Sequence, residues 1–271
     1  MMIMMMKRLL LAFALLVSAN TALAAEFDHS VWNGLLQNHV QMINHGQASQ
    51  VDYDGFLQKR AVLRTYLSQL SAVNASEFSI WSRSERLAFL INAYNAYTID
   101  LILTRYPKLD SIKDLGSFLQ TPWKKHFVPL FGKILSLDDI EHGMIRKSGD
   151  YNEPRIHFAV NCASIGCPGL LNEAYISSKL EAQLETMTRA FLADRSRNRY
   201  NVTTGRLEVS KIFDWYREDF ERGWKGWHKL DQFFAHYADS LTDTPEAKAS
   251  VIAGGVKIRF LDYDWVLNKQ K

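Results

Sequence analysis

Residues 82–107 read SRSERLAFLINAYNAYTIDLILTRYP, and they carry the strongest structural signal in the 271-residue chain. Ser82 and Glu85 have the spacing of a capping box, which marks the first turn of a helix. The residues that follow are apolar nearly all round until Pro107, and a helix of this kind is buried on all sides. We therefore predict a central helix that begins after Ser82 and ends before Pro107.

Two amides interrupt this apolar segment. Asn92 and Asn95 are three residues apart, so they share one face of the helix. A buried amide costs free energy unless it is hydrogen-bonded. The two side chains therefore either tie the helix to the backbone of a neighbouring loop or line the wall of a cleft that faces Cys162. The pattern leaves both interpretations open.

The rest of the chain predicts a helix-rich α+β domain around a small, mostly antiparallel sheet. The segment 25–80 is expected to be a helical lead-in, and 81–271 the main domain. Apolar spacing, turn residues and caps predict these elements: helices within 29–46, 53–73, 137–147, 175–194, 211–220 and 227–241, hairpins within 127–137 and 200–210, and strands at 155–161 and within 254–265.

The first residues have the pattern of a secretory signal peptide. Lys7 and Arg8 precede an apolar run, and Ala22-Leu23-Ala24 resembles a cleavage site. We expect cleavage after Ala24, a periplasmic or secreted protein, and no transmembrane segment afterwards. The net charge of the whole chain is only +3, and Lys7 and Arg8 would leave with the signal peptide. Nothing in this balance predicts a nucleic-acid partner.

Residues 155–169, RIHFAVNCASIGCPG, contain both cysteines of the chain. In an exported protein Cys162 and Cys167 are candidates for a disulfide that pins the loop. Alternatively, Cys162 is a nucleophile, or the two thiols form a redox pair, although the C-x4-C spacing lacks the C-x-x-C signature. His157 with the two cysteines is too weak a pattern for a metal site, so we expect no metal and no cofactor.

A thiol nucleophile needs a base or a positive charge nearby. On a strand at 155–161, His157 and Cys162 would start on opposite faces, so His142 is the better candidate base. In this hypothesis Glu141 or Asn92 orients His142, and Asn161 donates to the oxyanion. The side chains expected to line the cleft are Asn92, Asn95, Arg155, His157 and Ser164.

Two aromatic motifs occur late in the chain, FDWYREDF at 213–220 and LDYDWVLN at 261–268. Aromatic residues at these spacings form either core with a polar edge or a platform for a substrate. The sequence does not distinguish the two.

Five ordered motifs resemble the domain-of-unknown-function family 547, which occurs in exported bacterial proteins. The resemblance extends from about Arg86 to Asn268, and its motifs are FLINAYNAYTI, LSLDDIEHGMIR, RIHFAVNCASIGCP, KIFDWYREDF and YDWVLN. The Asn-Cys and Glu-His pairs invite a distant comparison with papain-like thiol hydrolases. In that fold the nucleophile begins a helix and the histidine lies on a strand, which is the reverse of the arrangement predicted here.

These observations predict a candidate cysteine hydrolase that acts on an amide or peptide bond of a small molecule or peptide. The first alternative is a non-catalytic protein that binds a partner in the envelope through a loop pinned by a Cys162–Cys167 disulfide. The second alternative is thiol–disulfide exchange.

Overall fold

The computed structural model describes residues 26–146 and 149–270 of the chain. The predicted signal peptide, residues 1–24, lies outside the described residues. The α-helices are α1 (Ser30–His39), α2 (Tyr53–Gln58), α3 (Arg60–Ala72), α4 (Ala75–Ile80), α5 (Arg83–Leu103), α6 (Leu180–Ala193), α7 (Ile212–Trp215), α8 (Arg217–Glu221), α9 (Leu230–His236), α10 (Ala238–Leu241) and α11 (Pro245–Ala253).

The strands are short and form three separate small sheets. They are β1 (Val40–Ile43), β2 (Ala48–Val51), β3 (Val128–Leu130), β4 (Lys133–Leu135), β5 (Arg199–Asn201), β6 (Arg206–Val209) and β7 (Lys257–Phe260). β1 pairs with β2, β3 with β4 and β5 with β6, all antiparallel, whereas β7 pairs parallel to β6. The predicted helix-rich α+β class is confirmed, but the strands are divided among three sheets.

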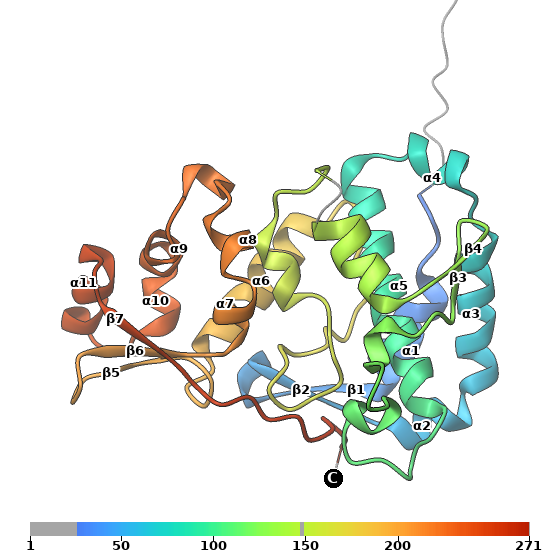
Figure 1. The fold of residues 1–271 in the computed structure, drawn as a ribbon, viewed down its shortest axis with the longest axis horizontal. Coiled ribbons are helices and arrows are strands. Elements are labelled where there is room, and N and C mark those ends of the chain that lie inside the picture. Colours follow the sequence, from blue (N-terminus) through green and yellow to red (C-terminus); the bar gives the residue numbers. More distant parts are fainter. Residues whose placement is uncertain (1–25, 147–148, 271) are drawn as a thin grey trace, which may run out of the picture.

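The remaining helical turns are irregular. They are the 3-10 helices Asn44–Gly46, Ile112–Leu115, Pro122–Lys124, Pro154–Phe158 and Trp224–Gly226, and the π-helix Asp139–Arg146. Figure 1 shows α1 to α5 gathered at one end of the molecule and α9 to α11 with β5 to β7 at the other. The chain between Pro154 and Gly169 runs between these two ends.

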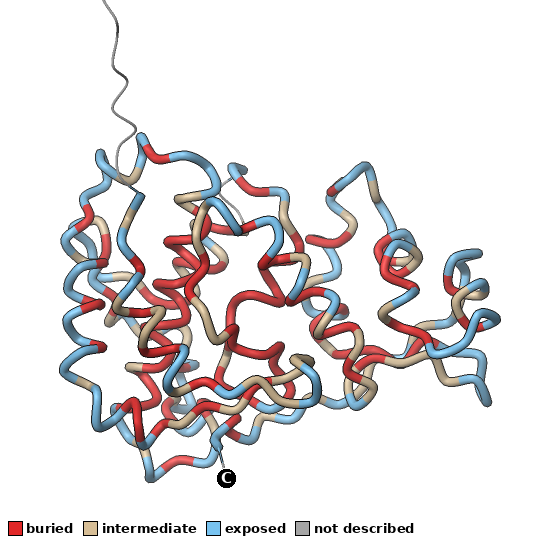
Figure 2. The backbone as a smooth tube through the Cα atoms, turned by 180° about the vertical axis from the view of Figure 1, so that it is seen from behind, coloured by how far each residue is buried: buried red, intermediate tan, exposed pale blue. Residues whose placement is uncertain are grey.

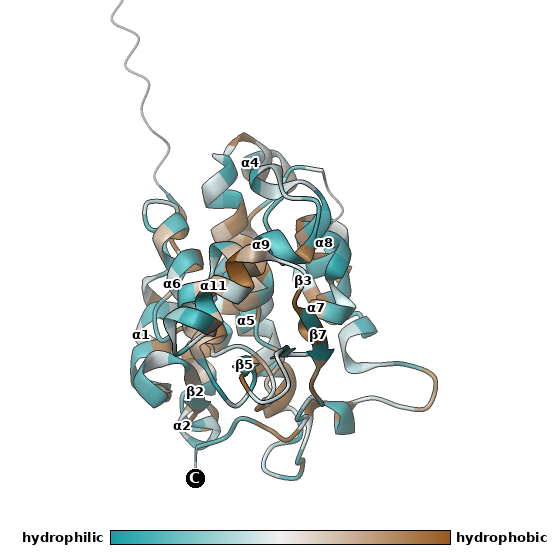
Figure 3. Ribbon diagram, turned by 90° about the vertical axis from the view of Figure 1, so that its left-hand side faces the viewer, coloured by the Kyte–Doolittle hydropathy of each residue, from teal (hydrophilic) through white to brown (hydrophobic). Residues whose placement is uncertain are grey.

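Helix α5 is the buried centre that the sequence predicts. The Ser82 hydroxyl accepts a hydrogen bond from the Glu85 amide at 3.1 Å, so the cap is present. The Glu85 carboxylate also accepts from the Phe27 amide, at 3.2 Å. Buried residues run through the middle of the molecule in Figure 2, and the outward faces of the helices are mainly hydrophilic in Figure 3.

Asn92 and Asn95 tie α5 to loops through paired hydrogen bonds. Asn92 donates to the Tyr175 carbonyl at 2.7 Å and accepts from the Tyr175 amide at 3.0 Å. Asn95 donates to the Ala159 carbonyl at 2.9 Å and accepts from the Asn161 amide at 2.8 Å. Each buried amide therefore satisfies backbone groups that would otherwise lack partners.

Two helix predictions near the N-terminus are wrong in detail. The first helix ends at His39 rather than at Gly46, because Val40–Ile43 forms a strand paired with β2. Gly46 is a turn residue of that hairpin, with φ +87°, a conformation that glycine adopts without steric cost. The helix predicted over 53–73 is divided into α2 and α3 at Lys59.

The strand predicted at 155–161 is also wrong, since Pro154–Phe158 is a 3-10 helix. Pro154 suits the first turn of a helix, and the Glu153 carboxylate caps the Arg155 amide at 3.1 Å. Residues 154–161 are all buried, so the alternation of polar and apolar residues does not reflect a solvent face. Arg155 and His157 are polar because each meets carboxylates inside the protein.

The C-terminal segment connects the two ends of the molecule. After β7 the chain runs back beneath the central loops to the β1–β2 hairpin (Figure 1), where Lys269 bridges to Val51. On the way Val266 accepts from the Ile165 amide at 2.8 Å. This path brings Tyr263 against the cysteine loop. None of the helices in the described part of the chain has the length and apolar character needed to cross a membrane.

Candidate active site around Cys162

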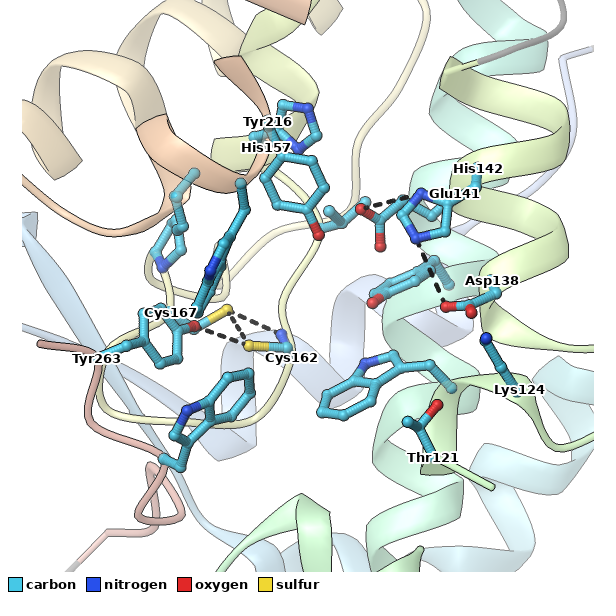
Figure 4. Close-up of a pocket in the computed structure, with 17 residues that line it drawn as sticks. Thr121, Lys124, Asp138, Glu141, His142, His157, Cys162, Cys167, Tyr216 and Tyr263 are labelled. Carbon is cyan, nitrogen blue, oxygen red and sulfur yellow. Dashed lines mark hydrogen bonds and ion pairs between the residues drawn. The ribbon is translucent and has the colours of Figure 1, made fainter. Parts of the chain in front are cut away.

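A cavity of about 330 Å³ lies between the cysteine loop, α5, the π-helix, α7 and the C-terminal segment (Figure 4). Most of its lining is aromatic or ionisable. The lining residues are Tyr94, Thr121, Trp123, Lys124, Asp138, Glu141, His142, His157, Val160, Cys162, Cys167, Pro168, Ile212, Trp215, Tyr216, Tyr263 and Trp265.

The loop that carries the cysteines is held by its own residues. Asn161 donates to the Pro168 carbonyl and accepts from the Ala163 amide, so its side chain braces the turn. Ala163 has φ +61°, which is uncommon for a residue with a side chain. Gly166 packs on the C-terminal segment, where a Cβ atom would lie 2.9 Å from backbone atoms of Asp264.

Cys162 and Cys167 are free thiols, and the disulfide considered from the sequence is absent. Their Sγ atoms lie 2.9 Å apart, well beyond the ~2.05 Å of a disulfide bond. The Cys167 sulfur also accepts a hydrogen bond from the Cys162 amide at 2.9 Å. The two sulfurs are therefore hydrogen-bonded partners in this structure.

The surroundings favour the thiolate form of Cys162. The hydrogen bond from Cys167 is the main cause of its lowered pKa, and the Ser164 and Tyr263 hydroxyls, 3.2 and 3.0 Å from Sγ, act in the same direction against burial. Burial and the neighbouring Cys162 raise the pKa of Cys167 well above its usual value. Burial likewise raises the pKa of Tyr263, so its hydroxyl keeps its proton and can donate it. In this site Cys162 is therefore the group that favours the anionic form, whereas Cys167 and Tyr263 keep their protons.

We expect Cys162 to be alkylated by iodoacetamide at least about tenfold faster than Cys167 at pH 7, because the thiolate is the nucleophile. Because the pKa of Cys162 is lowered, its alkylation rate should rise with pH and level off below pH 9.0, the ordinary value of the thiol. Peptide mass mapping over a pH series measures both rates. A Cys162 rate that still rises above that pH would contradict the lowered pKa.

His142 lies on the opposite wall of the cavity from Cys162 (Figure 4). Its Nδ1 atom is 2.6 Å from Arg146 Nη1, and its Nε2 atom is 3.6 Å from Asp138 Oδ1. Arginine can only donate, so Nδ1 accepts and the ring proton lies on Nε2. In this state His142 presents an N–H group, not a free lone pair. Burial raises the pKa of Asp138.

The predicted pairing of His142 with Cys162 is not formed in this structure. Within residues 26–146 and 149–270, the side-chain partners of Cys162 Sγ are Cys167, Ser164 and Tyr263. Glu141 does not orient His142 by a hydrogen bond, since its Oε1 atom is 3.9 Å from Nδ1. Asn92 is committed to Tyr175, and both ends of the Asn161 amide are occupied by backbone groups.

A second ionic cluster, centred on Asp219, contacts His142 through Arg146. Asp219 accepts hydrogen bonds from His157 Nε2 at 2.7 Å and Arg146 Nε at 2.5 Å, and it also pairs with Arg222. The His157 ring stacks on Tyr216 with ring centres 3.9 Å apart. Through Arg146, which also contacts His142, Asp219 fixes side chains on the cavity wall.

Of the side chains expected to line the cleft, His157 does so and the others lie elsewhere. Asn92 and Asn95 face loops, and Ser164 sits behind the Cys162 sulfur, bonded to Tyr263 at 3.1 Å. Arg155 is buried and binds three carboxylates, those of Glu153, Glu181 and Glu185.

Several cavity residues were not singled out from the sequence. The two aromatic motifs supply Trp215, Tyr216, Tyr263 and Trp265, and the ring centres of Tyr263 and Trp265 are 4.5 Å apart. Their position favours the substrate-platform interpretation over a purely structural one. Asp138 could have been noticed as the residue one turn before His142.

Among residues 26–146 and 149–270, no three His, Cys, Asp or Glu side chains are grouped as they would be around a metal ion. Residues 78–192 match the model of a family described as "Protein of unknown function, DUF547". This part of the chain belongs to that family. The predicted resemblance is therefore confirmed over these residues, and its extension to Asn268 stays a prediction.

The DUF547 segment contains α5, the π-helix and the cysteine loop, and thus Tyr94, Glu141, His142, Cys162 and Cys167. The rings of Trp215, Tyr216, Tyr263 and Trp265 come from beyond it. No curated protein and no solved structure matches the chain.

Proposed function

We propose that the protein is a thiol-dependent hydrolase that cleaves an amide or peptide bond of a substrate held in this cavity. The observation that carries the proposal is the Cys162 sulfur, which faces the cavity and lies within hydrogen-bonding distance of Ser164, Cys167 and Tyr263, whose hydrogen bonds lower its pKa. A thiol stabilised as thiolate by fixed donors needs no base to become nucleophilic. The proposal includes export of the chain, which rests on the signal-peptide pattern of residues 1–24.

The proposed reaction has two stages. The Cys162 thiolate attacks the carbonyl carbon, the C–N bond breaks, and the amine leaves with a proton taken from a water molecule, which becomes hydroxide. The hydroxide then attacks the thioester, the S–C bond breaks, and the carboxylic acid product leaves and gives its proton to solvent as the thiolate re-forms. His142 keeps its Nε2 proton throughout, because Nδ1 accepts from Arg146 and loss of that proton would leave an anionic ring.

Tyr263 is the best-placed donor for the oxyanion. Its hydroxyl lies 3.0 Å from Cys162 Sγ, and the carbonyl oxygen of an attacked substrate develops its charge two bonds away from that sulfur. The hydroxyl can therefore donate to the thiolate before the attack and to the oxyanion after it. We assign the oxyanion role to Tyr263 and not to Asn161, because both ends of the Asn161 amide are hydrogen-bonded within the loop.

Acyl trapping tests the proposal directly. The protein is mixed with p-nitrophenyl esters and p-nitroanilides of small carboxylic and amino acids, quenched in acid and weighed intact. We expect one acyl group on Cys162 together with continuing release of the chromophore, and no acylation of a Cys162→Ser variant at this position. Acylation without further turnover across the panel would argue against hydrolysis.

Thiol–disulfide exchange is a second candidate, favoured by the 2.9 Å separation of the two sulfurs. Cys162 would attack a small disulfide and release one thiol, and Cys167 would then displace the second and close a Cys162–Cys167 disulfide. Two electrons pass from the protein to the small disulfide in this sequence. Glutathione disulfide distinguishes the candidates, since exchange predicts rapid release of two glutathione molecules per protein and hydrolysis does not require it.

A further inference from the structure

The Glu141 carboxylate, on the cavity wall, has one buried oxygen without a hydrogen-bond donor. Its side chain is only 5% exposed, and it projects from the π-helix towards the cavity (Figure 4). Its Oε1 atom accepts no hydrogen bond from any residue that the structure describes. Burying a carboxylate oxygen without a hydrogen-bond donor costs free energy. The described protein provides no donor at this position, so a ligand that donates there would fill the gap.

The charged groups around Glu141 do not supply that donor. Arg146 binds Asp219 at 2.5 Å and His142 Nδ1 at 2.6 Å, so its guanidinium is already engaged. His142 Nδ1 is 3.9 Å from Oε1, but it is the nitrogen that accepts from Arg146 and carries no proton. The Lys124 charge acts on Asp138, the second carboxylate of this wall. None of these charged groups therefore donates a hydrogen bond to Glu141 Oε1.

Aromatic rings border the same part of the cavity. Tyr94 and Tyr216 both line it, and the pKa of each is raised first by burial and then by the negative charge of Glu141. A hydrogen bond with the Glu141 carboxylate raises the pKa of Tyr216 further, so Oε1 is the one carboxylate oxygen of Glu141 that is buried without a donor among the described residues. The faces of such rings attract cations when water is excluded. A buried carboxylate beside aromatic rings is a suitable environment for an ammonium group.

We infer that Glu141 Oε1 binds an ammonium group of the substrate, which holds the rest of the molecule over Cys162 on the opposite wall. The substrate class is then a primary amine that also carries the bond to be cleaved. The ammonium group is either the amino terminus of a peptide or the side-chain amine of a lysine-like residue. This inference rests on the proposed function for taking the cavity as a substrate site, and it makes Glu141 a binding group instead of an orienting one.

Ligand binding to the Cys162→Ala protein tests the inference without requiring any reaction. Trp123, Trp215 and Trp265 line the cavity, so their fluorescence reports occupancy. The probes are 2-phenylethylammonium and its neutral analogue 2-phenylethanol at pH 7. We expect the ammonium to bind about tenfold to a hundredfold more tightly, the range for a hydrogen bond to a charged group. Equal binding of the two probes, or binding of neither, would overturn the inference.

The variant Glu141→Gln keeps the size of the side chain and removes its charge. In the same Cys162→Ala background it should abolish the preference for the ammonium, whereas Glu218→Gln, at an exposed position on α8, should leave it unchanged. A preference that survives Glu141→Gln would refute the role of Glu141. Because the measurement uses a variant without the thiol, it stands even if the acyl-trapping experiment fails.

Two further probes separate the sources of the amine. Phenylalanine amide offers an α-ammonium, and Nα-acetyl-lysine amide offers a side-chain ammonium. The probe that binds more weakly to the Glu141→Gln protein identifies the source of the amine. If Glu141→Gln changes the affinity of neither probe, the result counts against the inference.

Discussion

The variant Cys162→Ala is expected to lose at least about a thousandfold in kcat/KM on any amide or ester that the protein hydrolyses, the scale seen when a nucleophile is removed. Alanine removes the attacking sulfur but fits the same space. Circular dichroism and thermal unfolding should show a folded protein, since Cys162 is held by the brace of Asn161 and by backbone pairing of its loop. Retention of most of the activity in this variant would exclude the thiol mechanism.

Variants of Cys167 decide which thiol chemistry operates. Cys167→Ala removes the donor that contributes most to the lowered pKa of Cys162, so activity should fall about tenfold at neutral pH and recover at higher pH. Cys167→Ser retains an O–H donor and should keep most hydrolysis. Thiol–disulfide exchange requires the second sulfur, so it would be lost in both variants. Loss of hydrolysis in Cys167→Ser at every pH would show that the second thiol does more than donate a hydrogen bond.

The sequence predicts the parts of this fold that depend on local patterns. Helix α5 is recognisable because it combines a Ser82 cap, a continuous apolar segment and Pro107 within one stretch. Ser136 likewise caps the helical turn that follows it within a few positions, with its hydroxyl accepting from the Asp139 amide at 3.1 Å. Caps, periodicity and turns involve residues within a few positions of each other, so one sequence suffices to detect them.

The parts that could not be predicted depend on contacts between distant residues. Residues 155–160 alternate like a strand, but Arg155 is polar because it binds the exposed carboxylate of Glu181, and His157 because it binds the buried carboxylate of Asp219, both far along the chain. The segment therefore has no solvent face, and the rule that assigns alternation to a strand does not apply. Without that strand, the argument from its two faces about His157 and Cys162 has no basis.

The thiol site shows the same limit. Cys162 is recognisable as a candidate nucleophile, but its donors Ser164 and Tyr263 are 2 and 101 positions away in the sequence. Tyr263 reaches the sulfur because the C-terminal segment pairs with the cysteine loop, where Gly166 permits close approach. No local pattern in LDYDWVLN reports that pairing. The aromatic motif and the cysteine motif become one site only in three dimensions.

Replacing Asp219 with Ala is expected to lower the free energy of unfolding by about 3–5 kcal/mol, the cost of removing one partner from a buried ionic cluster. The Asp219 side chain is 7% exposed, and the Arg146 and His157 side chains that bind it are 15% and 1% exposed. Without the carboxylate, Arg146 keeps a largely buried charge and loses its hydrogen-bonded counter-ion. Urea or thermal unfolding measures the difference. A loss below about 1 kcal/mol would mean that water or another group replaces the carboxylate.

The control is Asp243→Ala, which removes a partner of Arg195 at a side chain that is 72% exposed, and it should change stability by less than about 1 kcal/mol. The pH dependence separates a charge effect from lost packing. Burial opposes ionisation of Asp219, but the hydrogen bonds from His157 and Arg146 outweigh it and hold its pKa well below the ordinary 3.8. A depressed pKa stabilises the fold above pH 3.8 and ceases to do so as the pH falls below it. The stability difference between the wild type and Asp219→Ala should therefore shrink on acidification below that pH, whereas a difference that stays constant would assign the effect to packing alone.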